Sequence, residues 1–181
     1  DSCSPFVLAR KAGVSVKGKV ASYNGSHDFT VTLYQAGSDT VVGTPLMVSG
    51  NRASGPTEQE FTIPNVPAGE YDLVVTKEAH LKYTVKNVKV GSTDIDLTAM
   101  TEKPFSTITL LCGDIVKNGY IDFADYQELL SPANYGKKTT DTGVNALADL
   151  NGNGYIDFAD YQILLSSQHY GKSTVTVDFA E

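Results

Sequence analysis

The stretch NGYIDFADYQELLSPANYGK, residues 118–137, is the most informative part of this chain, because it returns as NGYIDFADYQILLSSQHYGK at residues 153–172. Only four of the twenty aligned positions differ. Each copy begins inside an acidic loop and continues into a short helical pattern. A repeat this faithful indicates either two stacked structural units or two equivalent binding faces.

The loop of the second copy, residues 149–160, has the spacing of a twelve-residue calcium loop. Oxygen-bearing side chains fall at positions 1, 3, 5, 9 and 12, and Gly154 stands at position 6, where the chain must turn sharply. Alternate residues of such a loop point inward, toward a hard cation that takes oxygen ligands. The expected ligands are the side chains of Asp149, Asn151, Asn153, Asp157 and Asp160 and the backbone carbonyl of Tyr155.

The loop of the first copy, residues 114–125, is less complete. Val116 stands at position 3 and offers no side-chain oxygen, so that ligand is lost unless water replaces it. The alternative interpretation is a pair of Asx-rich turns without metal, but two loops in tandem favour two bound Ca²⁺ ions. The expected ligands here are the side chains of Asp114, Asn118, Asp122 and Asp125 and the carbonyl of Tyr120.

The helical pattern after each loop has two apolar faces. In the first copy Tyr126 and Leu129 share one face and are expected to form a small core with Ile121. A helix of about three turns cannot readily bury the second face as well. That face either covers the rest of the chain or binds a partner, and its duplication favours a partner. The predicted partner-binding residues are Phe123, Ala124, Gln127, Leu130, Ser131 and Tyr135, and in the second copy Phe158, Ala159, Gln162, Leu165, Ser166 and Tyr170.

The first half of the chain alternates apolar and polar residues with a period of two. Turn residues such as Gly, Asn and Pro separate the alternating runs, which is typical of an antiparallel β-sandwich. The candidate strands are residues 14–20, 29–34, 61–63, 71–75, 83–90, 95–97 and 105–110. The tail after the repeats also reads as extended, and it either adds a strand to the sandwich or is disordered.

Composition narrows the class of protein. The net charge of -7 argues against a nucleic-acid partner. Residues 112–172 carry eight acidic and four basic side chains, a balance that bound cations would offset. No stretch is long and apolar enough to span a membrane. Cys3 and Cys112 either form a disulfide or are two separate thiols, and both alternatives stay open.

On these residues, the segment 112–172 resembles a dockerin, which has two loop–helix calcium motifs (F-hands) without the entering helix of an EF-hand. Residues 113–117 (GDIVK), with Val at the third ligand position, resemble dockerins that follow an X module. X modules are small sandwich domains packed directly against the dockerin. Residues 61–75 resemble the prealbumin-like sandwiches of extracellular proteins.

The resemblance implies an Ig- or prealbumin-like β-sandwich X module at residues 1–111, a small all-α calcium-binding dockerin at 112–172 and an extended tail at 173–181. Dockerins bind cohesin modules of scaffold or cell-surface proteins in cellulosome-type complexes. The chain is therefore expected to be a non-catalytic assembly module of a secreted bacterial protein, acting at the cell surface in polysaccharide degradation. The recognition positions of dockerins fall on the predicted partner-binding residues, and Phe-Ala and Leu-Ser pairs there imply an apolar interface.

Other function classes fit less well. A calcium sensor or buffer needs entering helices and an inducible groove. A calcium-dependent adhesion or carbohydrate-binding sandwich is the alternative to cohesin binding, but the chain has no Trp for a sugar-stacking platform. For an enzyme, His27, His80 and His169 are scattered, with no Cys or acid at nucleophile or zinc spacing.

Overall fold

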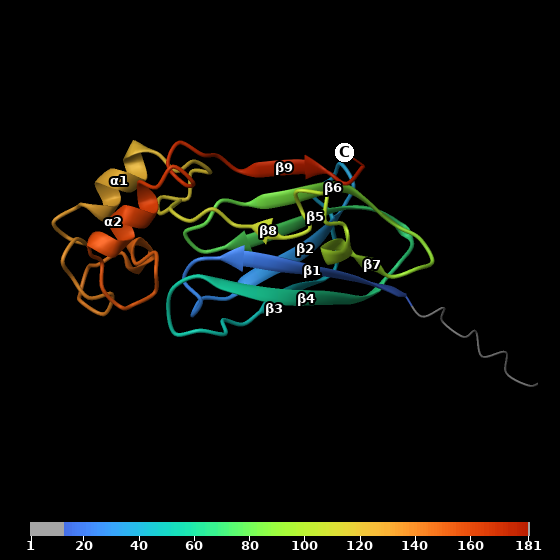
Figure 1. Cartoon of the computed structure of the whole chain (residues 1–181), viewed down its shortest axis with the longest axis horizontal. Coiled ribbons are helices and arrows are strands. Elements are labelled where there is room, and N and C mark those ends of the chain that lie inside the picture. The colour runs from blue at the N-terminus through green and yellow to red at the C-terminus, as the bar shows by residue number, and fades with distance from the viewer. Residues whose placement is uncertain (1–12, 181) are drawn as a thin grey trace, which may run out of the picture.

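Two sheets form the larger part of the chain in the structure, a computed structural model that describes residues 13–180 (Figure 1). The first sheet contains β4 (Thr57–Val66), β1 (Val14–Ser22) and β7 (Ile95–Asp96), and β8 (Ile108–Thr109) also pairs with β1. The second sheet runs β3 (Val41–Val48), β2 (Phe29–Gln35), β5 (Gly69–Lys77), β6 (Tyr83–Val90) and β9 (Val175–Asp178). A short 3-10 helix, η1 (Leu97–Ala99), follows β7. Within the described residues no helix has the length and apolar character needed to cross a bilayer.

The two sheets face each other across one apolar core. Val16 and Val20 of β1 point into it from the first sheet, and Leu73 and Val75 of β5 from the second. Leu73 and Val75 are 0% exposed, and each fully buried side chain of this size contributes about 1.5–3 kcal/mol. The alternation that predicts strands in the first half thus places one face of each sheet inside a β-sandwich.

The strand β3 has no counterpart among the candidate strands. It lies at the edge of its sheet and pairs only with β2 among the described strands, so most of its side chains are exposed and show no clean alternation. Gly43, at φ +73°, and Pro45 interrupt the run, which is typical of edge strands. Conversely, only Ile108–Thr109 of the candidate strand at residues 105–110 pairs as a strand.

Residues 112–172 do not form the all-α domain expected from the repeats, and that part of the fold prediction is wrong. This part of the chain has two α-helices of seven residues each, α1 (Phe123–Leu129) and α2 (Phe158–Leu164), and a 3-10 helix, η2 (Ala146–Ala148). At about 3.6 residues per turn, each α-helix has under two turns. Most of the remaining backbone is loop and turn, because Asp and Asn side chains accept hydrogen bonds from N–H groups that a helix would pair internally.

The two repeats are joined by equivalent backbone hydrogen bonds. In each repeat, one isoleucine that follows the loop turn bonds to the Gly-Lys pair at the end of the other repeat. The bonds are Ile121 N to Lys172 O (2.8 Å) and Gly171 N to Ile121 O (2.8 Å), with the equivalents Ile156 N to Lys137 O (2.9 Å) and Gly136 N to Ile156 O (2.8 Å). Because each repeat makes the same contacts with the other, the pair has an approximate twofold relation.

The repeats share their apolar core with the sandwich. Ala79 and Leu81, between β5 and β6, belong to the same buried cluster as Ile121, Leu129, Ile156 and Leu164 of the repeats. The amide of Leu81 also donates to the carbonyl of Leu111 (2.8 Å), which aligns the two parts. The repeats therefore depend on the sandwich for part of their core.

The chain returns to the sandwich after the second repeat. β9 runs parallel to β6, and Val175, Val177 and Phe179 pack against the sandwich core. The ring of Phe179 stacks on that of Phe105, with 5.6 Å between centroids. The tail thus joins the edge of the second sheet, the first of the two alternatives for it. The boundaries 1–111, 112–172 and 173–181 stay a prediction.

Candidate calcium loops and partner-binding surface

Both loops end in the same helix cap. Asp122 accepts a hydrogen bond from Ala124 N (2.8 Å), while Asp125 Oδ2 accepts one from Asp122 N (2.9 Å). Asp157 and Asp160 repeat this arrangement at the start of α2. Such a capping box satisfies N–H groups that the first helical turn leaves unpaired. The last carboxylate of each loop is therefore held in place by the helix that follows.

In the second loop, Asp149 organises the turn. Its carboxylate accepts hydrogen bonds from the amides of Gly152 (2.8 Å), Asn153 (3.1 Å) and Gly154 (2.8 Å). Asp160 Oδ1 reaches back to the amide of Asn151 (3.1 Å). The first and last acidic residues of the predicted ligand set thus bracket one loop.

The first loop has the same pattern of hydrogen bonds to its first and last carboxylates, but a different residue at the third ligand position. Asp114 accepts from the amides of Asn118 (2.9 Å) and Gly119 (3.1 Å). Asp125 Oδ1 accepts from Ile115 N (2.8 Å) and Val116 N (3.0 Å). The side chain of Val116 is 40% exposed and brings no oxygen to the loop.

Burial makes the charge on these carboxylates unfavourable. Asp125 and Asp160 are 0% exposed. The pKa of Asp160 is raised to about 6, because desolvation, together with the neighbouring charges of Asp149 and Asp157, outweighs the backbone hydrogen bonds that lower it. Desolvation also raises the pKa of Asp114 and that of Asp125. A cation beside these groups would favour their charged forms.

The donor set of each loop fits a hard cation. Within residues 13–180 no group of three or more His, Cys, Asp or Glu side chains is placed to hold a metal ion by itself. A cation would therefore need amide and carbonyl oxygens besides the carboxylates. Each loop carries that mixture, with Asn118 and the Tyr120 carbonyl in the first and Asn151, Asn153 and the Tyr155 carbonyl in the second. Oxygen-only sets of this kind suit Ca²⁺.

Four aromatic rings form a continuous row across the two helices, and we call them the aromatic row: Phe123, Tyr126, Tyr161 and Phe158. Phe123 stacks on Tyr126 and Phe158 on Tyr161, both with 5.6 Å between centroids. The two tyrosine rings lie 6.2 Å apart and join the pairs. Phe123 and Phe158 are 59% and 58% exposed, so the row ends in solvent on both helices.

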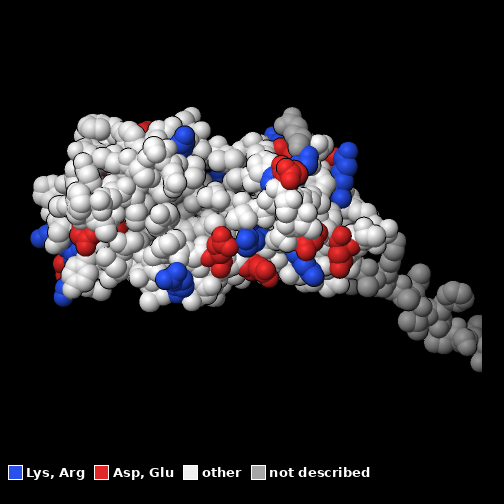
Figure 2. Space-filling model, in the orientation of Figure 1, with Lys and Arg blue, Asp and Glu red and all other residues white. Residues whose placement is uncertain are grey.

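The other predicted partner-binding residues surround the row. Leu130 is half-buried and also packs against the core of the repeats. The exposed ones are Gln127, Tyr135, Gln162, Leu165 and Tyr170, and the half-buried ones are Leu130, Ala124, Ser131, Ala159 and Ser166. On the face shown in Figure 2, the surface over the repeats is mostly uncharged, while charged side chains gather over the sandwich.

Tyr126 and Tyr161 were not among the predicted partner-binding residues. Tyr126 does pack against the core, as its helical position predicts, but it is only half-buried and its ring also stacks on Phe123. The Phe-x-x-Tyr spacing places both rings on neighbouring turns of one helix, and this signal is visible in both copies.

Two of the four positions that differ between the copies lie where each repeat meets a different neighbour. In the first copy, Asn134 Nδ2 donates to the carbonyl and carboxylate of Glu128, and Asn145 of the connecting segment bonds to both residues. In the second copy the equivalent of Asn134 is His169, whose ring meets Tyr23 of the sandwich edge-on at 5.4 Å. The equivalent of Glu128 is Ile163, which packs against the shared core. At these two positions the residues differ because their packing neighbours differ, while the residues of the aromatic row are the same in both copies.

His80 lies at the junction of the sandwich and the repeats. Its Nδ1 donates to the carbonyl of Glu78 (2.7 Å), because a carbonyl oxygen can only accept. Its Nε2 accepts from the amide of Tyr23 (3.2 Å), so the folded state needs a neutral ring. Desolvation lowers the pKa of His80 to about 3. Cys112 is also buried at this junction, whereas Cys3 lies outside the described residues, so a bridge between them stays a prediction.

Acid should weaken this junction. Between pH 7 and pH 5 the unfolded chain protonates His80, whose unperturbed pKa is near 6.5, while the folded chain does not. Stability is therefore present above about pH 6.5 and falls by about 2 kcal/mol at pH 5. Urea unfolding in saturating calcium at both pH values measures this change. His80→Gln should show a fall smaller by that amount, since the carboxylates titrate alike in both proteins. Equal falls in both proteins would contradict the role of His80.

No family model and no curated protein sequence matches this chain. Solved structures resemble its fold, among them two of type II cohesin–X-dockerin complexes from Acetivibrio cellulolyticus. A chain of an N-terminal interface mutant matches with a TM-score of 0.62 and 22% identity, over 90% of this chain and 98% of that one. A chain of a C-terminal interface mutant matches with a TM-score of 0.63 at the same identity and coverage. The fold of this chain is therefore similar, from the sandwich through the repeats, to that of a chain from a cohesin–X-dockerin complex.

Proposed function

We propose that this chain is a non-catalytic assembly module that binds a cohesin through the aromatic row and the residues around it. The observation that carries the proposal is an exposed apolar surface present twice, on helices related by an approximate twofold. Patches of this kind mark protein–protein contacts. The fold likeness to a chain of a cohesin–X-dockerin complex supports a cohesin as the partner.

The aromatic row has the properties of an interface centre. Aromatic side chains bury about 150–250 Å² each and supply much of the binding energy at interfaces. Stacking fixes the rings of Phe123 and Tyr126 before a partner arrives, and likewise those of Phe158 and Tyr161. Pre-ordered side chains lose less entropy on binding.

Two calcium ions, one per loop, belong to the proposal. The residues that would hold them are Asp114, Asn118, Tyr120, Asp122 and Asp125, and Asp149, Asn151, Asn153, Tyr155, Asp157 and Asp160. Calcium would supply positive charge beside buried carboxylates and so favour the closed loops that position α1 and α2. Val116 leaves the first loop one side-chain oxygen short of the second.

The sandwich would stabilise the binding module. Asn24 Nδ2 donates to the carbonyl of Asp149 (3.1 Å), and the amide of Gly55 donates to the carbonyl of Asn151. These bonds connect the second calcium loop to the sandwich. The parent protein would be anchored in an extracellular polysaccharide-degrading complex at the bacterial cell surface, through a cohesin of a scaffold or cell-surface protein.

Calorimetric titration of the whole chain against a panel of cohesins that includes type II cohesins tests the proposal. With calcium we expect one class to bind with a dissociation constant below about 1 µM, a value typical of specific interfaces. Titration after EDTA treatment should show no binding, because the loops position both helices. The proposal is wrong if no cohesin binds in calcium, and its calcium part is wrong if EDTA leaves the affinity unchanged.

A further inference from the structure

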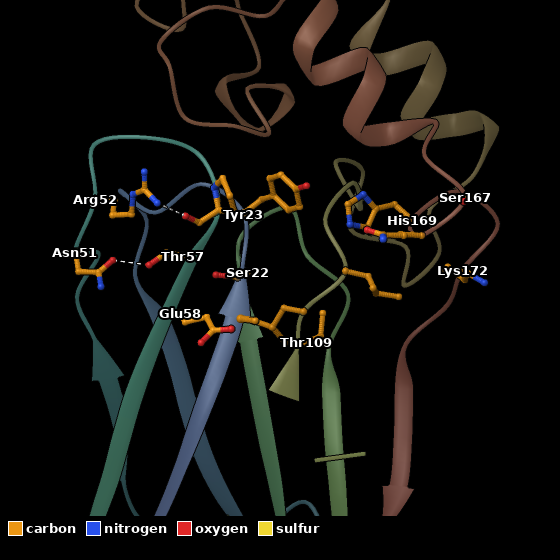
Figure 3. Close-up of a pocket in the computed structure, with 15 residues that line it drawn as sticks. Ser22, Tyr23, Asn51, Arg52, Thr57, Glu58, Thr109, Ser167, His169 and Lys172 are labelled. Carbon is orange, nitrogen blue, oxygen red and sulfur yellow. Dashed lines mark hydrogen bonds between the residues drawn. The ribbon is translucent and has the colours of Figure 1, made fainter. Parts of the chain in front are cut away.

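Hollows at the surface of the sandwich differ in what lines them. One of about 840 Å³ lies between the sandwich and the second repeat, with Arg52 and Lys172 at its opposite ends (Figure 3). The rings of Tyr23 and His169 lie between these cations, and the exposed Glu58 also lines this space, so it carries charges of both signs. A smaller hollow, of about 480 Å³, we call the edge groove, and none of the described residues that line it is charged.

The edge groove lies between β3 and β4, which are edge strands of the two sheets. At one end these strands are held together, because Gln59 Nε2 donates to the carbonyl of Ser49 (2.6 Å). Toward the other end they leave a space lined by Val42, Leu46 and Ile63, which also pack against the sandwich core. These three side chains are only half-buried, so the core of the sandwich is partly open along the groove.

The chain enters the sandwich at the open end of this groove. Val14 of β1 pairs with Val66 of β4, so β1 begins where β4 ends (Figure 1). Immediately before β1, Gly13 lies so close to Asn65 that a Cβ at position 13 would overlap the backbone of Asn65. Asn65 and Val66 both line the groove. The segment that precedes residue 13 therefore starts from the mouth of the edge groove.

That segment has a sequence suited to an apolar groove. Residues 5–9 read PFVLA, an uninterrupted apolar run, and three residues link this run to Gly13. Alternate side chains of an extended segment face the same way, so Phe6 and Leu8 share one face. The groove volume is within the range of about 300–1,000 Å³ in which proteins enclose small ligands, so both side chains fit in it.

A tethered segment suits this groove better than a second copy of the chain. The steps from Ala9 to Gly13 span up to about 14 Å, whereas passing β4 takes about two strand spacings, or about 10 Å. A tether this short gives an effective concentration on the order of 1 mM. Pro45 of β3 and Pro64 of β4 lack backbone donors, which disfavours pairing with an edge strand of another copy.

We propose that the edge groove binds residues 5–9 of the same chain, extended and antiparallel to β3, with Phe6 and Leu8 inside and Val7 outside. The direction follows from the link, since residue 9 must lie at the open end, where β3 begins. Docking covers the open part of the core and fixes the path by which the chain enters the sandwich. This site is separate from the aromatic row and does not depend on cohesin binding.

NMR spectroscopy of the calcium-loaded whole chain tests the inference. We expect nuclear Overhauser effects (NOEs) from the ring of Phe6 to the methyl groups of Val42, Leu46 and Ile63. A mixture of isotope-labelled and unlabelled chains separates contacts within one chain from contacts between two copies, and the NOEs should arise within one chain. The absence of these NOEs, or NOEs between copies only, would overturn the inference.

Variants of the segment give a second test. Phe6→Asp with Leu8→Asp should lower the Tm in saturating calcium by at least about 5 °C, because two apolar side chains leave the groove. Val7→Asp with Ala9→Asp is the matched control, since it adds the same two charges to the opposite face of the segment, and its Tm should stay within about 1 °C. Both variants should keep the circular-dichroism spectrum of the parent chain. Equal shifts in Tm for the two variants would also overturn the inference.

Discussion

Replacing Phe123 and Phe158 together by Asp is expected to abolish cohesin binding, with a loss of more than about 1000-fold in affinity. Both side chains are more than half exposed, so the substitutions leave the core of the repeats intact. In each of two possible docking orientations, one of the two Asp residues would place an unpaired charge where an aromatic ring should be buried. Calorimetric titration with the cohesin that binds the parent chain measures the loss.

Single substitutions should behave differently. The two helices carry the same residues of the aromatic row, and equivalent hydrogen bonds relate the repeats by an approximate twofold. The cohesin can therefore dock in two orientations. Phe123→Asp alone, or Phe158→Asp alone, removes one orientation and lowers the association constant about twofold. A single variant that already loses binding would show that one orientation is used, because the sandwich contacts the two repeats through different residues, Glu78 at Lys117 of the first and Tyr23 at His169 of the second.

Tyr120→Asp with Tyr155→Asp is the matched control for the aromatic row. Both tyrosines are exposed, at 58% and 48%, and each stands three residues before a phenylalanine of the row. The change introduces the same two charges into the same two repeats and keeps the backbone carbonyls of positions 120 and 155, which are the only atoms of these residues proposed to bind calcium. Affinity close to that of the parent chain is expected, and a loss as large as that of the phenylalanine pair would contradict the assignment of the surface.

Removal of calcium is the second change with a large expected effect. At calcium concentrations about 1000 times the dissociation constant, each bound ion contributes about 4 kcal/mol, which is a shift in Tm of about 10 °C per ion for a chain of this size. Without the cation, the buried Asp125 and Asp160 keep their charges at a desolvation cost. We expect EDTA to unfold residues 112–172 and to remove the helical circular-dichroism signal, while the sandwich core stays folded. An unchanged helical signal in EDTA would contradict a structural role for calcium.

Loop variants separate calcium binding from general acidity. Asp160→Asn should weaken the second site and lower the Tm in calcium, because Asp160 both caps α2 and ends the loop. Asp39→Asn removes an equal charge from an exposed turn of the sandwich and should leave the Tm within about 1 °C, as surface changes usually do. Similar shifts for both variants would mean that net charge, not a bound ion, controls stability.

Short-range patterns predicted much of this protein. The alternation in residues 71–75 places Leu73 and Val75 in the sandwich core, and the loop spacing brings Asp149 and Asp160 to the two ends of one turn. Each of these features depends on hydrogen bonds or side-chain directions within a few residues, so the sequence carries it directly. The repeat likewise shows without coordinates that Phe123 and Phe158 occupy equivalent places.

Two parts of the fold were not predicted from the sequence, the strand β3 and the loop-rich structure of residues 112–172, and each has a physical cause. The edge strand β3 shows no alternation of apolar and polar residues, because most of its side chains face solvent. It is a strand because it pairs with β2, and the sequence of residues 41–48 does not show that pairing. The all-α expectation for residues 112–172 failed because helix formation competes with backbone hydrogen bonds to loop carboxylates, and the loops prevail on both sides of α1 and α2.

The sequence by itself determined that two equivalent loop–helix repeats follow a set of alternating strands. Only the tertiary structure decided which faces of those elements are covered. Tyr126 and Tyr161 meet across two helices, and Tyr23 meets His169 over 146 positions of sequence, so local periodicity cannot show either contact. The same holds for Arg52 and Lys172, which line one cavity although 120 positions separate them in the sequence. Burial depends on which distant surfaces pack together, and that is a property of the whole fold.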